Sequence, residues 1–128
     1  MSAVNPATPP LRVLFVEDND DLREIIGILL EEEGLDVCPC ASAEEAETLF
    51  SQRPFDMVLT DVSLPKMSGT DLAKRLLATA PGTWIVFSTG YSLERGLEAW
   101  GPTVRVLPKP FEVEDLQALL GEIRAVRA

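Results

Sequence analysis

Histidine is absent from all 128 residues of the chain. Its absence excludes a serine or cysteine nucleophile activated by histidine, a zinc site with two histidines, and a phosphohistidine within the chain. Cysteine is scarce as well, since only Cys38 and Cys40 occur, and two thiols alone make a poor zinc site. Any chemistry must therefore come from carboxylates, hydroxyl groups and lysine.

Long apolar runs and positive charge are also lacking. No run approaches the roughly 18 apolar residues that a transmembrane helix needs, and the N-terminus lacks the charged start and apolar run of a signal peptide. The chain has 11 Lys and Arg against 21 Asp and Glu, a net charge of -10. A field of that sign repels nucleic acid and anionic membranes. We therefore expect a soluble, cytoplasmic protein that binds neither DNA directly nor a membrane.

The length and composition predict one domain with an aliphatic core. Hydrophobic residues make up 46% of the chain and aromatic residues only 6%. A chain of this size buries a core without disulfides or metal. The first ten residues, MSAVNPATPP, are small and rich in proline, which predicts a disordered leader over 1–10 and an ordered domain over 11–126.

Short apolar runs alternate with helical patterns five times, which is typical of repeated βα units around a parallel sheet. Five helices are expected, and the apolar residues of each recur at helical spacing. The expected strands are RVLFV (12–16), LDVCPC (35–40), DMVLT (56–60), WIVFS (84–88) and VRVL (104–107). The apolar stripes of the helices are Leu22, Ile25, Ile26, Leu29 and Leu30, then Ala46, Leu49 and Phe50, then Leu72, Leu76 and Leu77, then Leu93, Leu97 and Trp100, and finally Val113, Leu116, Leu120 and Ile123.

Local signals predict where two helices begin and end. Gly34 is expected to end the first helix, because glycine accommodates the left-handed backbone that often follows a helix. Ser42 and Glu45 have the spacing of a capping box, which predicts the start of the second helix.

Pro39 indicates the order of the strands. Proline has no N–H to donate, so the second strand should lie at an edge of the sheet. An edge position for that strand agrees with the doubly wound order 2-1-3-4-5, the flavodoxin-like arrangement, in which strands one and three are central. The fold class predicted is therefore α/β, with a doubly wound five-stranded parallel sheet.

Acidic residues and one lysine follow three of the predicted strands. Glu17 and Asp18 follow the first strand, Asp61 ends the third, and Lys109 follows the fifth. Ligands of open α/β sheets bind in the crevice outside the carboxyl ends of the strands. The sequence therefore brings carboxylates and one ammonium group to a single place, an arrangement that suits a divalent cation and a phosphoryl group.

Four motifs in order resemble the receiver domain of two-component response regulators, from Leu11 to about Arg124. They are LFVEDND after strand one, VLTDVSLPKMSG around strand three, FSTGY after strand four and VLPKPF after strand five. Each follows a strand and precedes a helix, so accidental agreement is improbable.

The resemblance implies a role for each matching residue. Asp61 would accept a phosphoryl group from a phosphohistidine on a histidine kinase or a histidine phosphotransfer protein, and the change would be passed to a downstream protein target. Lys109 and the hydroxyl of Thr89 would contact the phosphoryl group. A Mg²⁺ cofactor would be held by Asp18, Asp61 and the backbone carbonyl of Ser63, with Glu17 acting through a water. Such a domain is a binding module with slow self-dephosphorylation and not a metabolic enzyme.

Three features depart from the family pattern or depend on it. Val106 stands where the family usually carries Tyr or Phe, so the usual aromatic switch is missing. Tyr91 matches a variable position near the phosphoryl group, where its ring could shield the aspartyl phosphate from water. The peptide bond between Lys109 and Pro110 is expected to be cis, as in the family.

Other functions fit less well. A pseudo-receiver that binds partners without phosphorylation remains the alternative, although every residue for phosphorylation is present. Phosphatases of the haloacid dehalogenase type carry Asp-x-Asp, whereas this chain has Ser63 at the second acidic position. A calcium-binding EF-hand loop is excluded because Leu22 replaces an oxygen ligand and the loop glycine is absent.

Overall fold

The computed structural model describes residues 10–89, 101–109 and 112–127, and it contains the predicted strands with small shifts at their ends. The strands are β1 (Arg12–Val16), β2 (Asp36–Cys40), β3 (Met57–Asp61), β4 (Trp84–Thr89) and β5 (Val104–Pro108). The described helices are α1 (Asp20–Glu32), α2 (Ala43–Gln52), α3 (Gly69–Thr79) and α4 (Val113–Arg127). The predicted helix with Leu93, Leu97 and Trp100 lies outside the described residues, so α4 is the last of the five predicted helices.

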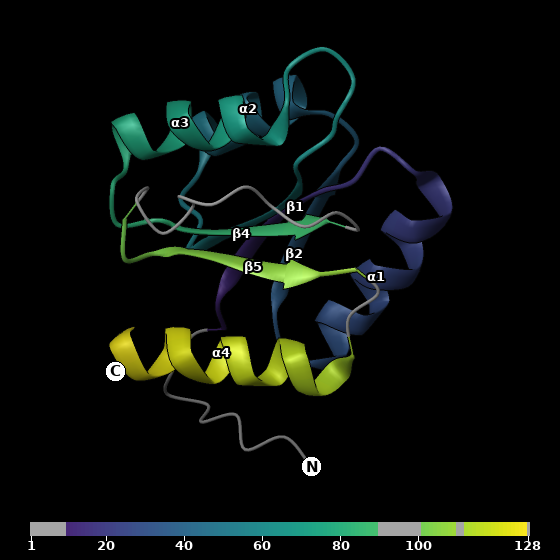
Figure 1. Ribbon diagram of the computed structural model, residues 1–128, viewed down its shortest axis with the longest axis vertical. Helices are drawn as coiled ribbons and strands as arrows, with labels where there is room; N and C mark the ends of the chain where they lie inside the picture. Colours follow the sequence, from purple (N-terminus) through teal and green to yellow (C-terminus); the bar gives the residue numbers. More distant parts are fainter. Residues whose placement is uncertain (1–9, 90–100, 110–111, 128) are drawn as a thin grey trace.

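The five strands form one parallel sheet in the order β2-β1-β3-β4-β5, which confirms the predicted topology. Helices cover both faces of this sheet (Figure 1). Helices α2 and α3 lie on one face, and α1 and α4 lie on the other. Because parallel strands need crossover connections, α1, α2 and α3 each return the chain to the start of the next strand, and the carboxyl ends of the strands lie on one side of the sheet.

Pro39 lies in β2, at the edge of the sheet, as its missing donor predicts. The N–H of Asp36 donates to the carbonyl of Leu11 and the carbonyl of Cys40 accepts from the N–H of Glu17, so both residues point their backbone groups toward β1. Backbone groups alternate in direction along a strand, so the nitrogen of Pro39 faces away from β1. The proline therefore costs the sheet no hydrogen bond.

Local signals at the helix ends are confirmed. Gly34 has φ of 82°, and its N–H donates to the carbonyl of Glu31, which ends α1 with a left-handed residue. The Ser42 hydroxyl accepts from the N–H of Glu45, so Ser42 caps α2 as its spacing to Glu45 predicts, and the Glu45 carboxylate accepts from the N–H of Ala41, the residue before the cap.

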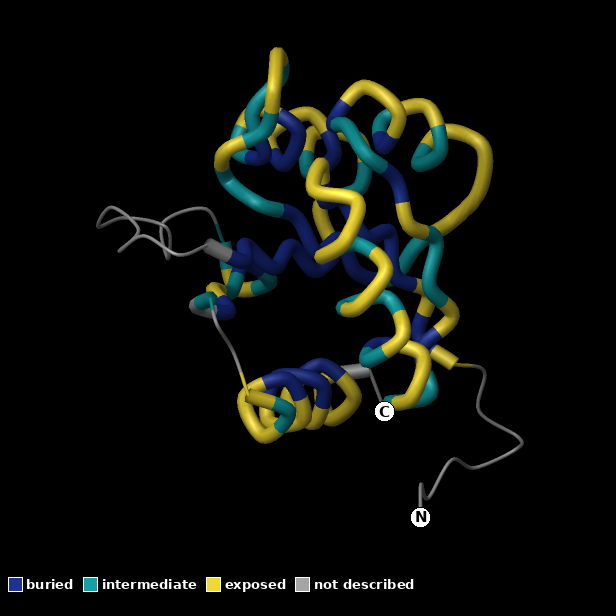
Figure 2. The backbone as a smooth tube through the Cα atoms, turned by 90° about the vertical axis from the view of Figure 1, so that its right-hand side faces the viewer, coloured by how far each residue is buried: buried dark blue, intermediate teal, exposed yellow. Residues whose placement is uncertain are grey.

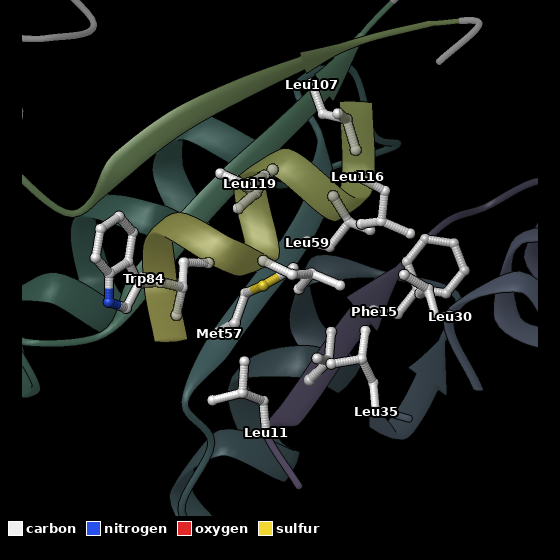
Figure 3. Close-up of a cluster of buried hydrophobic side chains, with 14 residues drawn as sticks. Leu11, Phe15, Leu30, Leu35, Met57, Leu59, Trp84, Leu107, Leu116 and Leu119 are labelled. Atoms are coloured by element: carbon white, nitrogen blue, oxygen red, sulfur yellow. The ribbon is translucent and has the colours of Figure 1, made fainter. Parts of the chain in front are cut away.

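Two hydrophobic clusters lie on opposite faces of the sheet, and strand residues contribute to them alternately. Val13 and Phe15 pack toward α1 and α4, whereas Leu14 and Val16 pack toward α2 and α3. Burial is concentrated in the strands and on the inner sides of the helices (Figure 2). Figure 3 shows the first cluster, where Leu11, Phe15, Leu30, Leu35, Met57, Leu59, Trp84, Leu107, Leu116 and Leu119 are labelled. The core is therefore aliphatic in the main, as the composition predicts.

The apolar stripe of α1 is only partly buried. Leu30 is fully buried, and Ile26 and Leu29 pack against the first cluster. Ile25, however, is 62% exposed.

In the part of the chain that the structure describes, no helix is long and apolar enough to cross a membrane.

Candidate functional site

The carboxyl ends of β1, β3 and β5 bring Glu17, Asp61 and Lys109 into contact. The Lys109 Nζ atom lies 2.9 Å from Glu17 Oε1 and 3.0 Å from Asp61 Oδ2. The lysine therefore bridges two carboxylates that are far apart in the sequence. The predicted convergence of these three side chains is what the structure shows, while their chemical roles remain predictions.

Strand alternation explains why these three side chains meet. Phe15, Leu59 and Leu107 all belong to the cluster under α1 and α4. Side chains two residues apart lie on the same face of a strand. Glu17, Asp61 and Lys109 each follow one of these apolar residues by two positions. The site therefore continues the apolar rows of the core on the same side of the sheet.

Glu17 is buried, with 3% of its surface exposed. Besides the bond to Lys109, its Oε2 atom accepts a hydrogen bond of 3.1 Å from the N–H of Asn19. Both carboxylate oxygens thus have donors, which offsets the cost of removing a charge from water. Glu17 acts here as the internal partner of Lys109.

The electrostatics of Lys109 favour its charged form. Burial of the ammonium group lowers its pKa, but the hydrogen bonds and charges of Glu17 and Asp61 raise it, so the pKa of Lys109 lies above its ordinary value. Lys109 is therefore a protonated ammonium group at neutral pH, held beside the Asp61 carboxylate.

The Asp61 carboxylate is oriented by one donor on each oxygen. Oδ2 faces Lys109, and Oδ1 accepts a hydrogen bond of 3.0 Å from the N–H of Ser63. The Asp61 side chain is 19% exposed, so a reagent can still approach it from solvent. A fixed, accessible carboxylate beside a cation is suited to act as a nucleophile toward an anionic group.

Gly69 and Thr60 hold the backbone of Asp61. A Cβ atom on Gly69 would lie 1.9 Å from the Asp61 carbonyl oxygen, closer than any two such atoms can approach. The same carbonyl accepts a hydrogen bond of 3.0 Å from the Thr60 hydroxyl. No pattern in the sequence pointed to this packing of Gly69 against Asp61, which only the structure reveals.

The loop between Asp61 and α3 is fastened at several points. The N–H of Gly69 donates to the carbonyl of Val62, and the N–H of Met67 donates to Glu44 Oε2 at 3.2 Å. Lys66 has φ of 64°, a left-handed conformation that is unfavourable for a residue with a side chain. This loop therefore has a defined path, part of which is strained.

The remaining predicted residues are placed less completely. Asp18 is exposed at the end of β1, next to the buried Glu17. Thr89 is the last residue of β4, one position beyond Ser88, the register partner of Asp61. Val106 is 40% exposed on β5. The expectations for Tyr91 and for the Lys109–Pro110 bond fall on residues outside those described.

The donor atoms fit a magnesium ion that keeps most of its waters. Within residues 10–89, 101–109 and 112–127, no group of three or more acidic, histidine or cysteine side chains is close enough to hold an ion alone. Magnesium requires only one or two carboxylates besides water and phosphate oxygens. Asp18 lies two residues after β1, Asp61 ends the neighbouring strand β3, and both supply such oxygens. With Glu17 and Lys109, the site carries three carboxylates and one ammonium, a net charge of -2 that a divalent cation balances.

The fold and site together define a doubly wound α/β domain with an acidic cluster at its switch point. Comparison with known proteins is consistent with this class, since the response regulator receiver domain family matches residues 13–121. The chain therefore belongs to the response regulator receiver domain family, which operates in two-component signal transduction.

Individual relatives agree with this assignment. The chain is 33% identical over 107 residues to the response regulator receiver protein CpdR of Brucella abortus, covering 82% of this chain and 89% of CpdR. It is 31% identical to the autoinducer 1 sensor kinase/phosphatase LuxN of Vibrio harveyi, covering 85% of this chain but 13% of LuxN. Among solved structures, the chemotaxis protein CheY4 of Vibrio cholerae has a TM-score of 0.79 and 27% identity, covering 89% of this chain and 98% of that one.

Proposed function

We propose that this receiver domain accepts a phosphoryl group on Asp61 from a phosphohistidine of a partner protein, in a reaction that requires Mg²⁺. The observation that carries the proposal is the orientation of the Asp61 carboxylate, whose two oxygens receive hydrogen bonds from Lys109 and from the N–H of Ser63. The phosphorylated domain then signals through altered contacts with a downstream protein target.

In the proposed transfer, a carboxylate oxygen of Asp61 attacks phosphorus while the bond from phosphorus to the histidine nitrogen of the partner breaks. The products are an aspartyl phosphate and an imidazole that regains its proton from water. Lys109 neutralises charge on a phosphoryl oxygen, and the Thr89 hydroxyl donates to another. When bound by Asp18, Asp61 and the Ser63 carbonyl, with Glu17 acting through a water, Mg²⁺ supplies further positive charge at the phosphoryl oxygens.

The proposal includes a cytoplasmic location and a partner that is a histidine kinase or a histidine phosphotransfer protein. The match to LuxN supports such a partner, because a sequence like this one occurs within a protein named as a sensor kinase. The chain itself acts as a binding module, with self-phosphorylation from a donor and slow self-dephosphorylation as its only reactions.

Phosphate incorporation tests the proposal directly. The protein is incubated with acetyl phosphate and Mg²⁺, and intact mass spectrometry counts added phosphoryl groups. We expect one group on the wild type and none on Asp61→Asn. Asp56→Asn is the matched control, because Asp56 accepts from the Arg12 N–H at the opposite end of the strands. No incorporation into the wild type would favour the pseudo-receiver instead, and equal incorporation into Asp61→Asn would refute the choice of Asp61.

A further inference from the structure

Arg23 reaches back from the first turns of α1 to the segment that carries the acidic pair. Its Nη1 atom donates a hydrogen bond of 2.8 Å to the carbonyl oxygen of Glu17. Its Nη2 atom forms an ion pair of 2.5 Å with Asp20. The Arg23 side chain is only 23% exposed, so the guanidinium group is packed against the protein and not extended into water.

The carbonyl that Arg23 holds belongs to the peptide bond between Glu17 and Asp18. Fixing the direction of this peptide fixes where the backbone delivers the Asp18 side chain. The same segment is held on its other side, because the N–H of Asn19 donates to the Glu17 carboxylate and Asn19 caps α1 through the N–H of Leu22. Arg23 therefore completes a closed set of bonds around the residues that would bind the ion.

We propose that Arg23 is a positioning residue for the magnesium site: its guanidinium group holds the peptide between Glu17 and Asp18 so that the Asp18 carboxylate is preorganised for the cation. This inference rests on the proposed function, because it concerns the same ion. Arg23 itself does not touch the cation or the phosphoryl group. Its contribution is to order the segment of Glu17 and Asp18 before the ion binds, which lowers the conformational entropy that binding costs.

Electrostatics alone predicts the opposite effect of removing Arg23. A positive charge near a cation site repels the cation, so losing that charge should strengthen binding. Loss of positioning should weaken binding instead. The sign of the change in magnesium affinity therefore separates the two roles.

The test uses Arg23→Gln, which removes the charge, and Arg23→Lys, which keeps it. A lysine ammonium lacks the planar fork of arginine that contacts the Glu17 carbonyl and Asp20 together. Arg75→Gln is the matched control, since it also removes one charge and one helix-surface ion pair, with Glu47, away from the acidic segment. Calorimetry measures Mg²⁺ affinity, and amide hydrogen exchange measures the order of the Asn19 N–H in the metal-free protein.

We expect both Arg23 variants to bind Mg²⁺ about fivefold more weakly than the wild type, the loss expected from one or two hydrogen bonds. We also expect their Asn19 amide to exchange faster, while amides of β3 are unchanged and Arg75→Gln behaves like the wild type. Unchanged or tighter Mg²⁺ binding in Arg23→Gln would overturn the inference.

The proposed function and the positioning role fail in different ways. A wild type that binds no Mg²⁺ would refute the metal requirement of the proposed function. In that case hydrogen exchange still tests whether Arg23 orders the segment, because it is measured in the metal-free protein. Faster exchange at Asn19 in both variants would support ordering by Arg23, and wild-type exchange would refute it.

Discussion

The contact between Gly69 and Asp61 makes Gly69→Ala a sharp test of how the site is built. The added Cβ would lie 1.9 Å from the Asp61 carbonyl oxygen and 2.9 Å from its carbonyl carbon. Ordinary contacts between such atoms are about 3.5 Å. The start of α3 and the end of β3 must therefore separate by about 1.5 Å, and both are backbone, so no side chain can rotate to relieve the overlap.

Two effects of different size follow from this displacement. Forcing a methyl group into a packed position costs about 1–3 kcal/mol, so we expect Gly69→Ala to lower the free energy of unfolding by about 2 kcal/mol. The shift also moves Asp61 relative to Lys109 Nζ, now 3.0 Å from its carboxylate. A misplacement of this order reduces the rate of a positioned reaction by about 100-fold. The phosphorylation rate should therefore fall strongly, while most of the protein remains folded.

Urea denaturation and the rate of phosphorylation by acetyl phosphate measure the two effects. Gly121→Ala is the control, because a Cβ there meets nothing within 4 Å on the surface of α4. The helix preference of alanine should make that variant more stable by about 0.5–1 kcal/mol, with a normal phosphorylation rate. If Gly69→Ala matched the wild type in both stability and rate, the reasoning about Asp61 would be refuted.

Three further predictions concern single side chains. Lys109→Met leaves two carboxylates without their cation and should lower the free energy of unfolding by about 2 kcal/mol in urea titrations at pH 7. Because the pKa of Lys109 is raised above 10.5, the charged lysine stabilises the fold fully below pH 10.5, and this stabilisation is lost as the pH rises through the raised pKa. The difference in free energy of unfolding between the wild type and Lys109→Met should therefore shrink in strong alkali, and a constant difference would contradict this. Burial, with a smaller effect from a nearby glutamate, raises the pKa of Cys40 to about 12, so iodoacetamide at pH 8 should label Cys38 alone, and mass spectrometry should find no label on Cys38→Ser. Lys66→Gly should raise the free energy of unfolding by about 0.5 kcal/mol by relieving its left-handed backbone, whereas Lys74→Gly within α3 should lower it by about 1 kcal/mol.

The order of the strands and the proximity of the charged side chains could both be predicted from the sequence. Pro39 indicated an edge strand because proline lacks a donor, and this edge position agreed with the doubly wound order that the alternation of strands and helices suggests. Asp61 and Lys109 could be brought together because parallel strands end at one edge. Both inferences depend on strand direction and order, which follow from the alternation of strands and helices along the chain.

Contacts that depend on the exact path of the backbone were not predictable in the same way. The hydrogen bond from Arg23 to the Glu17 carbonyl requires a particular entry angle of α1, and no residue pattern encodes that angle. The approach of Gly69 to Asp61 depends on the course of a loop with a left-handed Lys66. The hydrogen bond between Glu17 and Lys109 was not anticipated either, while the role of Glu17 at a metal-bound water stays a prediction.

The outward-facing proline of β2 has a consequence for the behaviour of the protein at high concentration. An uncovered sheet edge is a template on which strands of other molecules can assemble. Along β2 the backbone groups that face away from β1 belong to Val37 and Pro39, so Val37 offers the sole outward N–H of that strand. A second strand could not complete a regular ladder there. Pro39→Val would restore the missing donor, and the edge would then favour intermolecular aggregation without any change to the site.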